Sequence, residues 1–508
     1  MAMTELLLGI DSGQTVGKAA LFALDGREVA VASAPTKVTS VRPRWAERDM
    51  DEVWLQMCVA VREVVAQAGP SARIVGVGLC GHNDGLYAVD AQGRPVRPAI
   101  LATDSRAHAE SARLSDGEAG RRALALTGQV PSAASPASVL SWLRAHEPES
   151  FSAARWALFC KDWLRFRLTG EIATDPSEAS AAFTDLNTHD WSAAALELYD
   201  LTDAADRLPP LMPSSSVAGH ITSEAAALTG LQQGTPVVTG AHDVDAAAIG
   251  IGAVSPGSAS IVLGTYSINQ VLADHPAPDA RWQARSYVQP GRWLHMSTSP
   301  AGAGCLDWAV RRIGPWADDG GPDAGAAVAE ALRDGHREHG PLFLPFVHGS
   351  PHGHDVAGSW LALRGWHERA DLLRAVMEGV AFNHRTHLDA LREVFGIDRP
   401  VRVCGGGARS AGWTQMLADV TGLPLEVTDA TEAGARGAAL LAGVGVGAYP
   451  DVAAAAESTV RVTRHQEPDV APSRIYNARY RRYLAGVEAV RGLEFDPDEG
   501  AEGREELL

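Results

Sequence analysis

The sequence predicts an α/β protein built from two similar halves, and three glycine-containing turns support this prediction. Residues 9–15 and residues 263–267 each place glycine and threonine in a short turn between two apolar runs, as in a strand hairpin. Residues 401–408 are typical of a strand that enters a glycine turn ahead of a helix. Glycine lets backbone N–H groups approach an anion closely, so each turn is a candidate phosphate-binding element. Together the three turns indicate an enzyme that uses ATP.

The first half is predicted to alternate strands and helices. Residues 6–10 form the apolar run of a buried strand, and residues 19–22 are its return. A helix follows at about residues 49–68, and residues 73–79 and 87–89 are predicted as two further strands. This alternation is typical of an α/β domain.

The helix at residues 49–68 has recognisable ends and one apolar face. Asp49 or Asp51 is its expected N-cap, and Gly69 with Pro70 is its expected stop. The apolar face consists of Val53, Trp54, Met57, Val61 and Val64.

The middle of the chain contains an insertion and then a boundary. A helical region is predicted at about residues 134–168, which carries Trp142, Trp156 and Trp163. Residues 237–239 form a short apolar strand, and the turn at residues 255–257 is where the second half begins.

The second half contains two predicted helices, at residues 369–395 and 413–421. The expected domains are therefore an N-terminal domain at residues 1–253 and a C-terminal domain at residues 254–492. Residues 493–508 are rich in acidic residues and glycine and are expected to be a solvated tail.

Composition excludes several classes of function. The chain has 508 residues, of which 46% are hydrophobic and 21% charged, as in an ordinary globular protein. Its formal net charge of −18 disfavours binding to nucleic acid or to an anionic membrane and favours a neutral substrate.

The cysteines and the N-terminus predict a cytoplasmic protein. The five cysteines have no metal-like spacing and are expected to be reduced core residues. The N-terminus lacks the basic region of a signal peptide. The uncharged stretch at residues 246–273 is interrupted by glycine and proline, so we expect a buried strand pair there rather than a membrane helix.

Five motifs in order resemble one family, the FGGY carbohydrate kinases of the actin and hexokinase superfamily, over nearly the whole chain. They are similar to the first phosphate motif, a tryptophan-acid segment, the second phosphate motif, the C-terminal signature and the adenosine motif, at residues 9–18, 45–49, 263–267, 365–382 and 405–419 respectively.

The resemblance implies an ATP-dependent sugar kinase with two ribonuclease-H-like domains and a cleft between them. The first domain would bind the sugar and the second the ATP. Within the family the chain is most similar to the pentulose kinases, xylulokinase and L-xylulose kinase. It departs from the pattern at Gln14, where many members have threonine, and at Ala102, where many have a sugar-stacking tryptophan.

Asp243 is the expected catalytic base. Phosphoryl transfer needs little covalent help, but the acceptor hydroxyl must lose a proton to a carboxylate within hydrogen-bond reach. Asp243 follows the strand at residues 237–239 through a glycine, and the resemblance puts the base at this position. Asp245 is the alternative, although capping of a helix or a supporting role suits it better.

Asp11 and Asp243 are expected to hold Mg²⁺ near the ATP phosphates. The alternative for Asp11 is a turn acid bonded to its own backbone. Lys18 and Thr265 also have interpretations that involve no ligand. Lys18 is then a solvated residue at a strand edge, and Thr265 is an ordinary β-branched residue of a hairpin. The full set expected to bind the nucleotide and its phosphates is Asp11, Gly13, Thr15, Lys18, Gly264, Thr265, Gly405, Gly406, Gly407 and Gln415.

Two loops are expected to bind the sugar. Residues 81–85 occupy the place of the family's sugar loop, and residues 100–106 resemble its Trp-Asn-Asp-x-Arg segment. The candidate ligands are His82, Asn83, Asp84, Asp104 and Arg106.

Two further patterns are set aside. Residues 76–81 fit a dinucleotide-binding fingerprint, but a second strand is expected after them instead of a helix, so their glycines are better explained by tight packing and access to the sugar. The histidines at 336, 339, 348, 352 and 354 have no helical face in common, so no structural zinc is predicted.

The expected reaction is phosphorylation of a ketopentose, D-xylulose or L-xylulose, at a terminal hydroxyl. A polyol such as erythritol, xylitol or ribitol is the alternative substrate. A non-catalytic sugar-binding regulator, or an actin-like ATPase switch, is the alternative from another class. ATP, Mg²⁺ and a small sugar are the expected ligands, with neither nucleic acid nor membrane as partner, and a homodimer is one assembly that the sequence leaves open.

Overall fold

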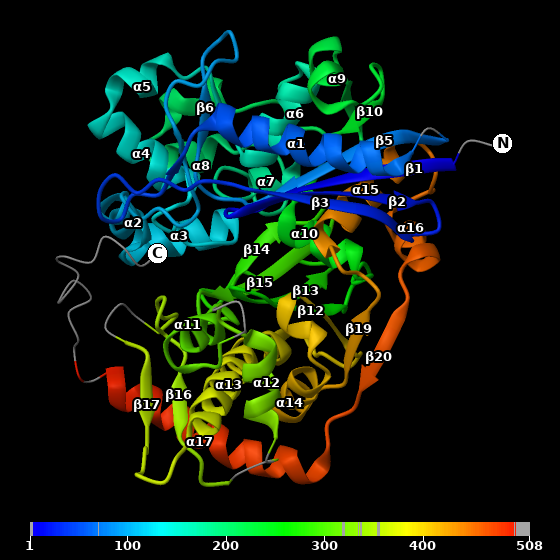
Figure 1. Ribbon diagram of the computed structural model, residues 1–508. Helices are drawn as coiled ribbons and strands as arrows, with labels where there is room; N and C mark the ends of the chain where they lie inside the picture. Colours follow the sequence, from blue (N-terminus) through cyan, green and yellow to red (C-terminus); the bar gives the residue numbers. More distant parts are fainter. Residues whose placement is uncertain are drawn as a thin grey trace. The chain divides into compact units, whose positions relative to one another are not determined.

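The computed structural model describes residues 4–69, 71–316, 321–333, 335, 338–352, 356–491 and 493 (Figure 1). The chain divides into two compact units. The first unit comprises residues 1–256, 272–295 and 430–461, and the second comprises residues 257–271, 296–429 and 462–508. Neither unit is one continuous stretch of chain, and the boundary expected between residues 253 and 254 stays a prediction. Pro70 and the expected tail from residue 494 onward lie outside the described residues.

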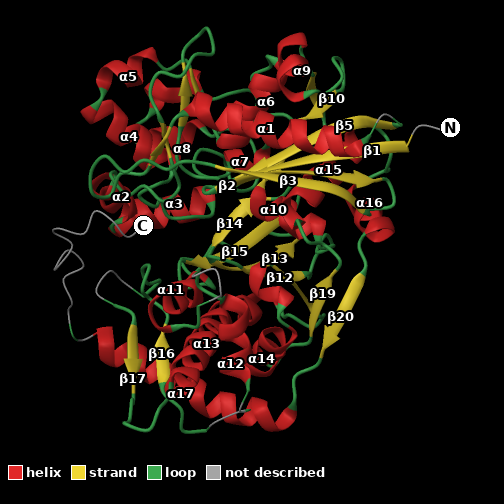
Figure 2. Ribbon diagram, viewed as in Figure 1, coloured by secondary structure: helices red, strands yellow, loops and turns green. Residues whose placement is uncertain are grey.

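The first unit is built on a mixed sheet of order β3-β2-β1-β5-β10-β9, in which β11 also pairs with β5 (Figure 2). The predicted hairpin is confirmed, because β1 (Thr4–Ser12) and β2 (Val16–Ala23) pair antiparallel, with Asp11 opposite Lys18. On its other side β1 runs parallel to β5 (Ala72–Gly81). The predicted phosphate turn therefore lies at one end of β1, an interior strand of this sheet.

Alternate residues of β1 face two different helices. Leu6, Leu8 and Ile10 belong to the same hydrophobic cluster as the buried face of α1 (Met50–Ala68). On the opposite face, a Cβ added at Gly9 would lie 1.7 Å from the Ala435 carbonyl oxygen of α15 (Ala433–Gly445). Because side chains alternate across a strand, α1 and α15 cover opposite faces of the sheet.

The glycines of β5 serve the same packing. A Cβ at Gly78 would lie 1.9 Å from the Ala438 oxygen of α15, and one at Gly76 would lie 3.0 Å from Val446. After β5 the chain forms a loop and then β6 (Tyr87–Val89), so no helix opens there. The tight-packing interpretation of these glycines is confirmed for Gly78.

Helix α1 begins as predicted, since the Asp49 side chain accepts a hydrogen bond from the Glu52 backbone N–H at 2.8 Å. It ends before Gly69, whose φ of 78° lies in the left-handed region that favours glycine. Trp163 ties it to α6 (Cys160–Thr169) by donating to the Met50 carbonyl oxygen at 2.8 Å.

Two of the expectations for the first unit are corrected. The region expected to be helical at residues 134–168 is interrupted by a strand, β8 (Trp156–Leu158), which pairs with β6. Trp156 therefore lies on a strand. The stretch at residues 246–273 begins as the end of α10 (Asp243–Gly250) and only then forms a strand pair.

The predicted second hairpin is confirmed, because β12 (Ala259–Leu263) and β13 (Ser267–Ala273) pair antiparallel. β12 and the residues of β13 up to Val271 belong to the second unit. β12 runs parallel to β18 (Val401–Cys404). The long helix α13 spans Arg369–Phe395, as predicted, and α14 spans Ala411–Thr421 and ends at the left-handed Gly422.

The remaining elements with all their residues in the first unit are β3 (Glu28–Pro35), β4 (Glu47–Arg48), β7 (Ala99–Ile100), α2 (His108–Ser115), α3 (Gly117–Thr127), α4 (Pro136–His146), α5 (Pro148–Ala153), α7 (Pro176–Ala179), α8 (Ala193–Leu198), η1 (Thr202–Arg207), β9 (Val217–His220), α9 (Ser223–Thr229), β10 (Pro236–Val238), β11 (Ala241–His242), β14 (Gln283–Ser286) and α16 (Val452–Thr459).

Strand β15 (Trp293–Ser299) has residues in each of the two units. The remaining elements of the second unit are α11 (Gly304–Ile313), α12 (Ala324–Leu332), β16 (Leu342–Leu344), β17 (Ser359–Leu361), η2 (Gly406–Arg409), β19 (Leu425–Thr428), β20 (Val462–Gln466) and α17 (Val470–Arg491).

The cysteines are free and buried, as predicted. Over the part of the chain that the structure describes, no helix has the length and apolar character needed to cross a membrane.

Candidate active site

The predicted base and the predicted sugar loop start from neighbouring strand ends in the first unit. β11 runs parallel to the end of β5, with Ala241 opposite Cys80 and His242 opposite Gly81. The residue after β11 is Asp243, which is the first residue of α10, and the residue after β5 is His82. The Asp243 side chain is 32% exposed and the Asp245 side chain is fully buried. Asp243 is therefore the carboxylate of this pair that a ligand can reach.

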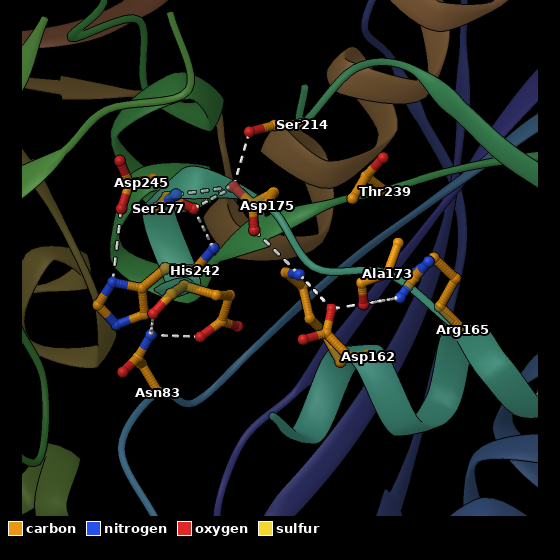
Figure 3. A network of polar contacts seen from close by, with 12 residues as sticks. Asn83, Asp162, Arg165, Ala173, Asp175, Ser177, Ser214, Thr239, His242 and Asp245 are labelled. Atoms are coloured by element: carbon orange, nitrogen blue, oxygen red, sulfur yellow. Dashed lines mark hydrogen bonds and ion pairs between the residues drawn. The ribbon is translucent and has the colours of Figure 1, made fainter. Parts of the chain in front are cut away.

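His242 pairs with both aspartates, and Figure 3 shows its contact with Asp245. Its Nε2 is 3.1 Å from Asp243 Oδ1, and its Nδ1 is 3.4 Å from Asp245 Oδ2. Burial opposes the charge of the imidazolium, but the two carboxylates outweigh it and raise the pKa of His242 to about 10. The charged ring thus holds one oxygen of Asp243 in place.

Asp245 is buried beside His242, in a position consistent with the supporting role expected from the sequence. Burial raises its pKa to about 6, against the opposing effect of the His242 charge. Helix α10 has His242 as its N-cap and no side-chain cap hydrogen bond, so within the described chain neither aspartate caps it.

His242 is connected to a buried polar network that the sequence analysis did not predict (Figure 3). The His242 backbone N–H donates to Ser177 Oγ at 2.9 Å, and Ser177 Oγ–H donates to Asp175 Oδ2 at 2.6 Å. Lys161 Nζ joins Asp175 to Asp162, at 2.9 and 2.7 Å. Burying a lysine in this way requires compensating carboxylates, and the network fixes the backbone from which His242 projects.

The predicted sugar loop is anchored to the same network. Asn83 Nδ2 donates to the carboxylate and to the backbone oxygen of Glu178, which is on α7. Burial raises the pKa of Glu178 well above its ordinary value, although the charges of Lys161 and His242 oppose this. Asp84 has a φ of 62°, in the left-handed region, and its Oδ1 is 3.4 Å from Arg285 Nη2.

His82 is held by two contacts. Its Nε2 is 3.2 Å from the Tyr87 hydroxyl oxygen, and its backbone N–H donates to the Ser12 carbonyl oxygen at 3.1 Å. Ser12 ends β1, so this hydrogen bond ties the predicted sugar loop to the predicted phosphate turn.

Asp104 and Arg106 form a buried ion pair. Both side chains are fully buried and are joined at 2.7 Å between Arg106 Nη2 and Asp104 Oδ2. Arg106 also lies over the ring of Trp45, 3.7 Å from its centroid, and pairs with Glu47 at 2.8 Å. Contact of these two residues with a sugar stays a prediction, whereas their contact with the tryptophan-acid segment is observed.

Asp11 lies at the end of β1, on the face that α15 covers. A Cβ added at Gly434, in the first turn of α15, would lie 2.4 Å from Asp11 Oδ2. Burial and the negative charge of Asp243 raise the pKa of Asp11 to about 7, while Lys18 opposes this. Two carboxylates that repel each other in this way suit a divalent cation, and Mg²⁺ commonly binds through one or two carboxylates with water and phosphate oxygens.

The other residues predicted on the first turn are placed as follows. Lys18 Nζ pairs with Glu432 Oε2 at 2.6 Å, and its side chain is 36% exposed. The Gly13 N–H donates to the Val16 carbonyl oxygen at 3.2 Å, and the Thr15 carbonyl oxygen accepts from Thr36 at 2.9 Å. Lys18 thus has a counterion within its own unit.

In the second unit, the two predicted nucleotide-binding turns lie side by side. A Cβ at Gly405, whose φ is 95°, would lie 2.7 Å from the Leu263 carbonyl oxygen and 3.2 Å from the Gly264 nitrogen. One at Gly407 would meet the Leu263 side chain at 2.5 Å, whereas no described atom lies within 4 Å of a Cβ built at Gly406. Thr265 accepts a hydrogen bond through its carbonyl oxygen from Gly304 at 3.3 Å.

Gln415 has partners within the protein. Its Nε2 donates to Asp419 Oδ1 at 2.9 Å and to the Glu467 carbonyl oxygen at 2.8 Å. A role in binding the adenosine stays a prediction for this residue. Among the histidines set aside above, those at positions 336 and 354 lie outside the described residues, and the expectation of no structural zinc stays a prediction.

Two buried histidines lie behind the second hairpin. His384 Nδ1 is 3.1 Å from Ser267 Oγ and 2.8 Å from Asn269 Oδ1, both on β13. His387 Nδ1 is 2.7 Å from Ser297 Oγ. Burial, together with the neighbouring histidine, lowers the pKa of His384 to about 3.

We expect His384→Gln to weaken the acid sensitivity of the fold. The unfolded chain takes up a proton on this ring below its ordinary pKa of 6.5, whereas the native ring does so only near 3, so its contribution to stability is lost as the pH falls below 6.5. Between pH 7 and pH 5 this loss is about 2 kcal/mol for one such group. Urea unfolding at the two pH values measures it, and an equal loss in the variant would contradict the prediction.

Comparison with known proteins identifies both halves of the chain. The N-terminal domain of the FGGY family of carbohydrate kinases matches residues 6–250, and the C-terminal domain of the same family matches residues 259–446. The chain is 35% identical to the L-xylulose/3-keto-L-gulonate kinase of Escherichia coli K12, over 97% of this chain and 98% of that protein. It is 32% identical to the autoinducer-2 kinase of Enterobacter sp. 638, over 96% of this chain and 95% of that protein.

A solved structure agrees with these sequence matches. The crystal structure of xylulose kinase from Rhodospirillum rubrum superposes with a TM-score of 0.85 at 29% identity, over 96% of this chain and 99% of that one. The two-domain α/β fold predicted from the sequence is thereby confirmed. Since both family domains match in succession and cover more than half of the residues, the chain belongs to the FGGY family of carbohydrate kinases, which transfer a phosphoryl group from ATP to a sugar.

Proposed function

We propose that this kinase phosphorylates a terminal hydroxyl of a ketopentose, L-xylulose or D-xylulose, with Asp243 as the general base. The observation that carries the proposal is the arrangement at the start of α10. Asp243 is partly exposed there, next to the predicted sugar loop, and one of its oxygens is 3.1 Å from His242 Nε2. The names of relatives support the choice of sugar, since they include L-xylulose and xylulose kinases.

Asp243 would act on the acceptor hydroxyl. With Oδ1 beside His242, the carboxylate has its other oxygen to accept a hydrogen bond from the sugar and then its proton, as the hydroxyl oxygen attacks the γ-phosphorus of ATP. The transition state is loose, so positioning and charge stabilisation supply most of the rate enhancement. The buried network under His242 serves the positioning.

The two glycine turns and the adenosine motif would hold ATP, with backbone N–H groups around Gly13 and Gly264 directed at the phosphates. Asp11 and Asp243 would hold Mg²⁺, since burial and the charge of Asp243 raise the pKa of Asp11 and a bound cation would offset both effects. Mg²⁺ neutralises charge on the transferred phosphoryl group when it is bound. We further propose a cytoplasmic enzyme, with a homodimer as the assembly to test.

Other substrates belong to the same proposal as alternatives. The E. coli relative is named for 3-keto-L-gulonate as well as L-xylulose, and another relative is named for autoinducer-2. A polyol remains the alternative predicted from the sequence. A non-catalytic regulator is disfavoured by the partly exposed Asp243 beside Asp11.

The test is ADP release from purified enzyme with ATP and Mg²⁺ against a panel of L-xylulose, D-xylulose, xylitol, ribitol and erythritol. We expect a ketopentose to give the highest kcat/KM, and phosphorus-coupled NMR of the product to show a terminal phosphate. Omission of Mg²⁺ is the control for the metal. Release of ADP that no sugar stimulates above the rate with water alone would overturn the proposal.

A further inference from the structure

Arg285 is a buried arginine whose hydrogen-bonding capacity is largely unused. It lies on β14, and its side chain is 3% exposed. Its Nη2 is 3.4 Å from Asp84 Oδ1, which is a long contact. Its Nε and Nη1 are buried and have no hydrogen-bond partner among the described residues.

The guanidinium belongs to the neighbourhood of the proposed base. Asp84 is part of the predicted sugar loop, and β14 packs against α7, which carries the Glu178 partner of Asn83. The charge of Arg285 lowers the pKa of both His242 and Asp245. All of these residues belong to the first unit.

A second donor without a partner lies two residues along the chain. The Tyr287 side chain is 2% exposed, and its hydroxyl has no hydrogen-bond partner within the described ranges. Burial, with the negative charge of Asp245, raises the pKa of this hydroxyl well above its ordinary value, so Tyr287 remains a donor. Arg285 therefore supplies buried N–H groups beside Asp84 of the predicted sugar loop, and Tyr287 supplies a buried O–H group near Asp245.

The free-energy cost of burying donors without acceptors indicates the function of these groups. A buried donor without an acceptor loses its hydrogen bonds to water and gains none in return, and the cost is greater for a charged group. Asp84 compensates the charge of Arg285 only in part, through the long contact, and leaves the Nε and Nη1 hydrogens without an acceptor. A carboxylate on a bound ligand supplies both a negative charge and acceptor oxygens, and its hydrogen bonds to a guanidinium are stronger than those of a neutral hydroxyl.

We infer that Arg285 is a specificity residue of the sugar site that binds the carboxylate of an anionic substrate, so that the enzyme accepts a keto sugar acid in addition to neutral ketoses. The inference rests on the proposed function, because it extends the sugar site around Asp243. Tyr287 would donate a second hydrogen bond to the same end of the substrate. The alternative role for Arg285, as a counterion for Asp84 alone, makes no distinction between charged and neutral sugars.

The test compares Arg285→Met with wild type on L-xylulose and on keto-hexonates that have the ketone at carbon 2 and at carbon 3. We expect the ratio of kcat/KM for the better keto-hexonate to that for L-xylulose to fall about 100-fold in the variant, since a charge-assisted hydrogen bond is lost for one substrate only. Arg285→Lys keeps the charge, so we expect the same ratio of kcat/KM values to fall less in this variant. Arg281→Met is the matched control, because Arg281 is 44% exposed and pairs with Asp279 on the same segment.

Calorimetric titration without ATP provides a second readout that needs no turnover. Binding of a keto-hexonate to wild type that is lost in Arg285→Met supports the inference, and Arg285→Lys takes the place of the methionine variant if the latter does not fold. Inorganic phosphate is titrated in parallel. If the substitution of Arg285 abolishes binding of phosphate but not of a keto-hexonate, the inference is overturned in favour of a phosphate site.

The remaining outcomes separate the inference from the proposed function. If wild type phosphorylates L-xylulose but neither binds nor phosphorylates a keto-hexonate, the inference is overturned and the function stands. An equal loss on both substrates in Arg285→Met overturns it as well. If no sugar is phosphorylated, the proposed function fails and the titration alone decides the role of Arg285.

Discussion

Asp243→Ala is expected to lower kcat by about 10²–10⁴-fold, with KM for the sugar changed only a few-fold, because a general base contributes mainly in the transition state. The substitution removes the carboxylate that would accept the hydroxyl proton, and we expect it to disturb the fold little. Asp243 is 32% exposed and makes no cap hydrogen bond in α10. Steady-state kinetics at saturating Mg²⁺ on the best sugar of the panel measure the effect.

Two comparisons make this result specific. Asp398→Ala removes an exposed aspartate in the second unit and is expected to keep wild-type kinetics. Asp245→Asn removes a buried charge beside His242 and is expected to lower the unfolding temperature as well as kcat. Full turnover by Asp243→Ala, with an unfolding temperature equal to that of wild type, would rule out the assigned base.

Gly78→Ala is expected to destabilise the protein by more than about 3 kcal/mol or to prevent folding. The added Cβ would lie 1.9 Å from the Ala438 carbonyl oxygen, and the obstacle is helix backbone that cannot rotate away. The same argument applies to Gly9, whose Cβ would lie 1.7 Å from the Ala435 oxygen. Accommodation would require α15 to move off the sheet and open the core.

Chemical denaturation and soluble yield measure this effect, and Gly365→Ala is the matched control. Gly365 has no described atom within 4 Å of an added Cβ and no positive φ, so this substitution is expected to change stability by less than about 1 kcal/mol. If Gly78→Ala had the stability of the control, the close contact between strand and helix would be refuted.

Much of the fold could be predicted because apolar periodicity and turn residues agree locally. The apolar run of β1, the Asp49 cap of α1 and the long apolar stripe of α13 each specify one element without reference to the rest of the chain. The strand at Trp156 was missed because three residues within an apolar region give no period that separates strand from helix.

The site could be predicted only in part. The glycine turns and Asp243 were predicted because their types and order resemble a family, whereas the partners that hold them are distant in sequence. Lys161, Asp162 and Arg165 look like a solvated helix face, yet all three side chains are fully buried. The local pattern does not indicate this burial, since the three residues share one face of α6 at i, i+1 and i+4 spacing, as they would on a solvated helix.

The burial of Arg285 could not be predicted from the sequence either. Nothing in the local sequence around residues 283–287 distinguishes it from Arg281, which is exposed and paired with Asp279. Only the three-dimensional structure shows that Arg285 is buried beside Asp84, with two nitrogens that have no hydrogen-bond partner among the described residues.

The place of α15 in the first unit has a consequence for biosynthesis. The ribosome completes β1 and β5 within the first 81 residues, but it makes the helix that covers their glycine-lined face only at residues 433–445. Through most of translation that face therefore lacks its native cover, and the nascent first unit cannot reach its final form until the segment at residues 430–461 has left the exit tunnel. Folding of the first unit is thus a late event, tied to completion of nearly the whole polypeptide.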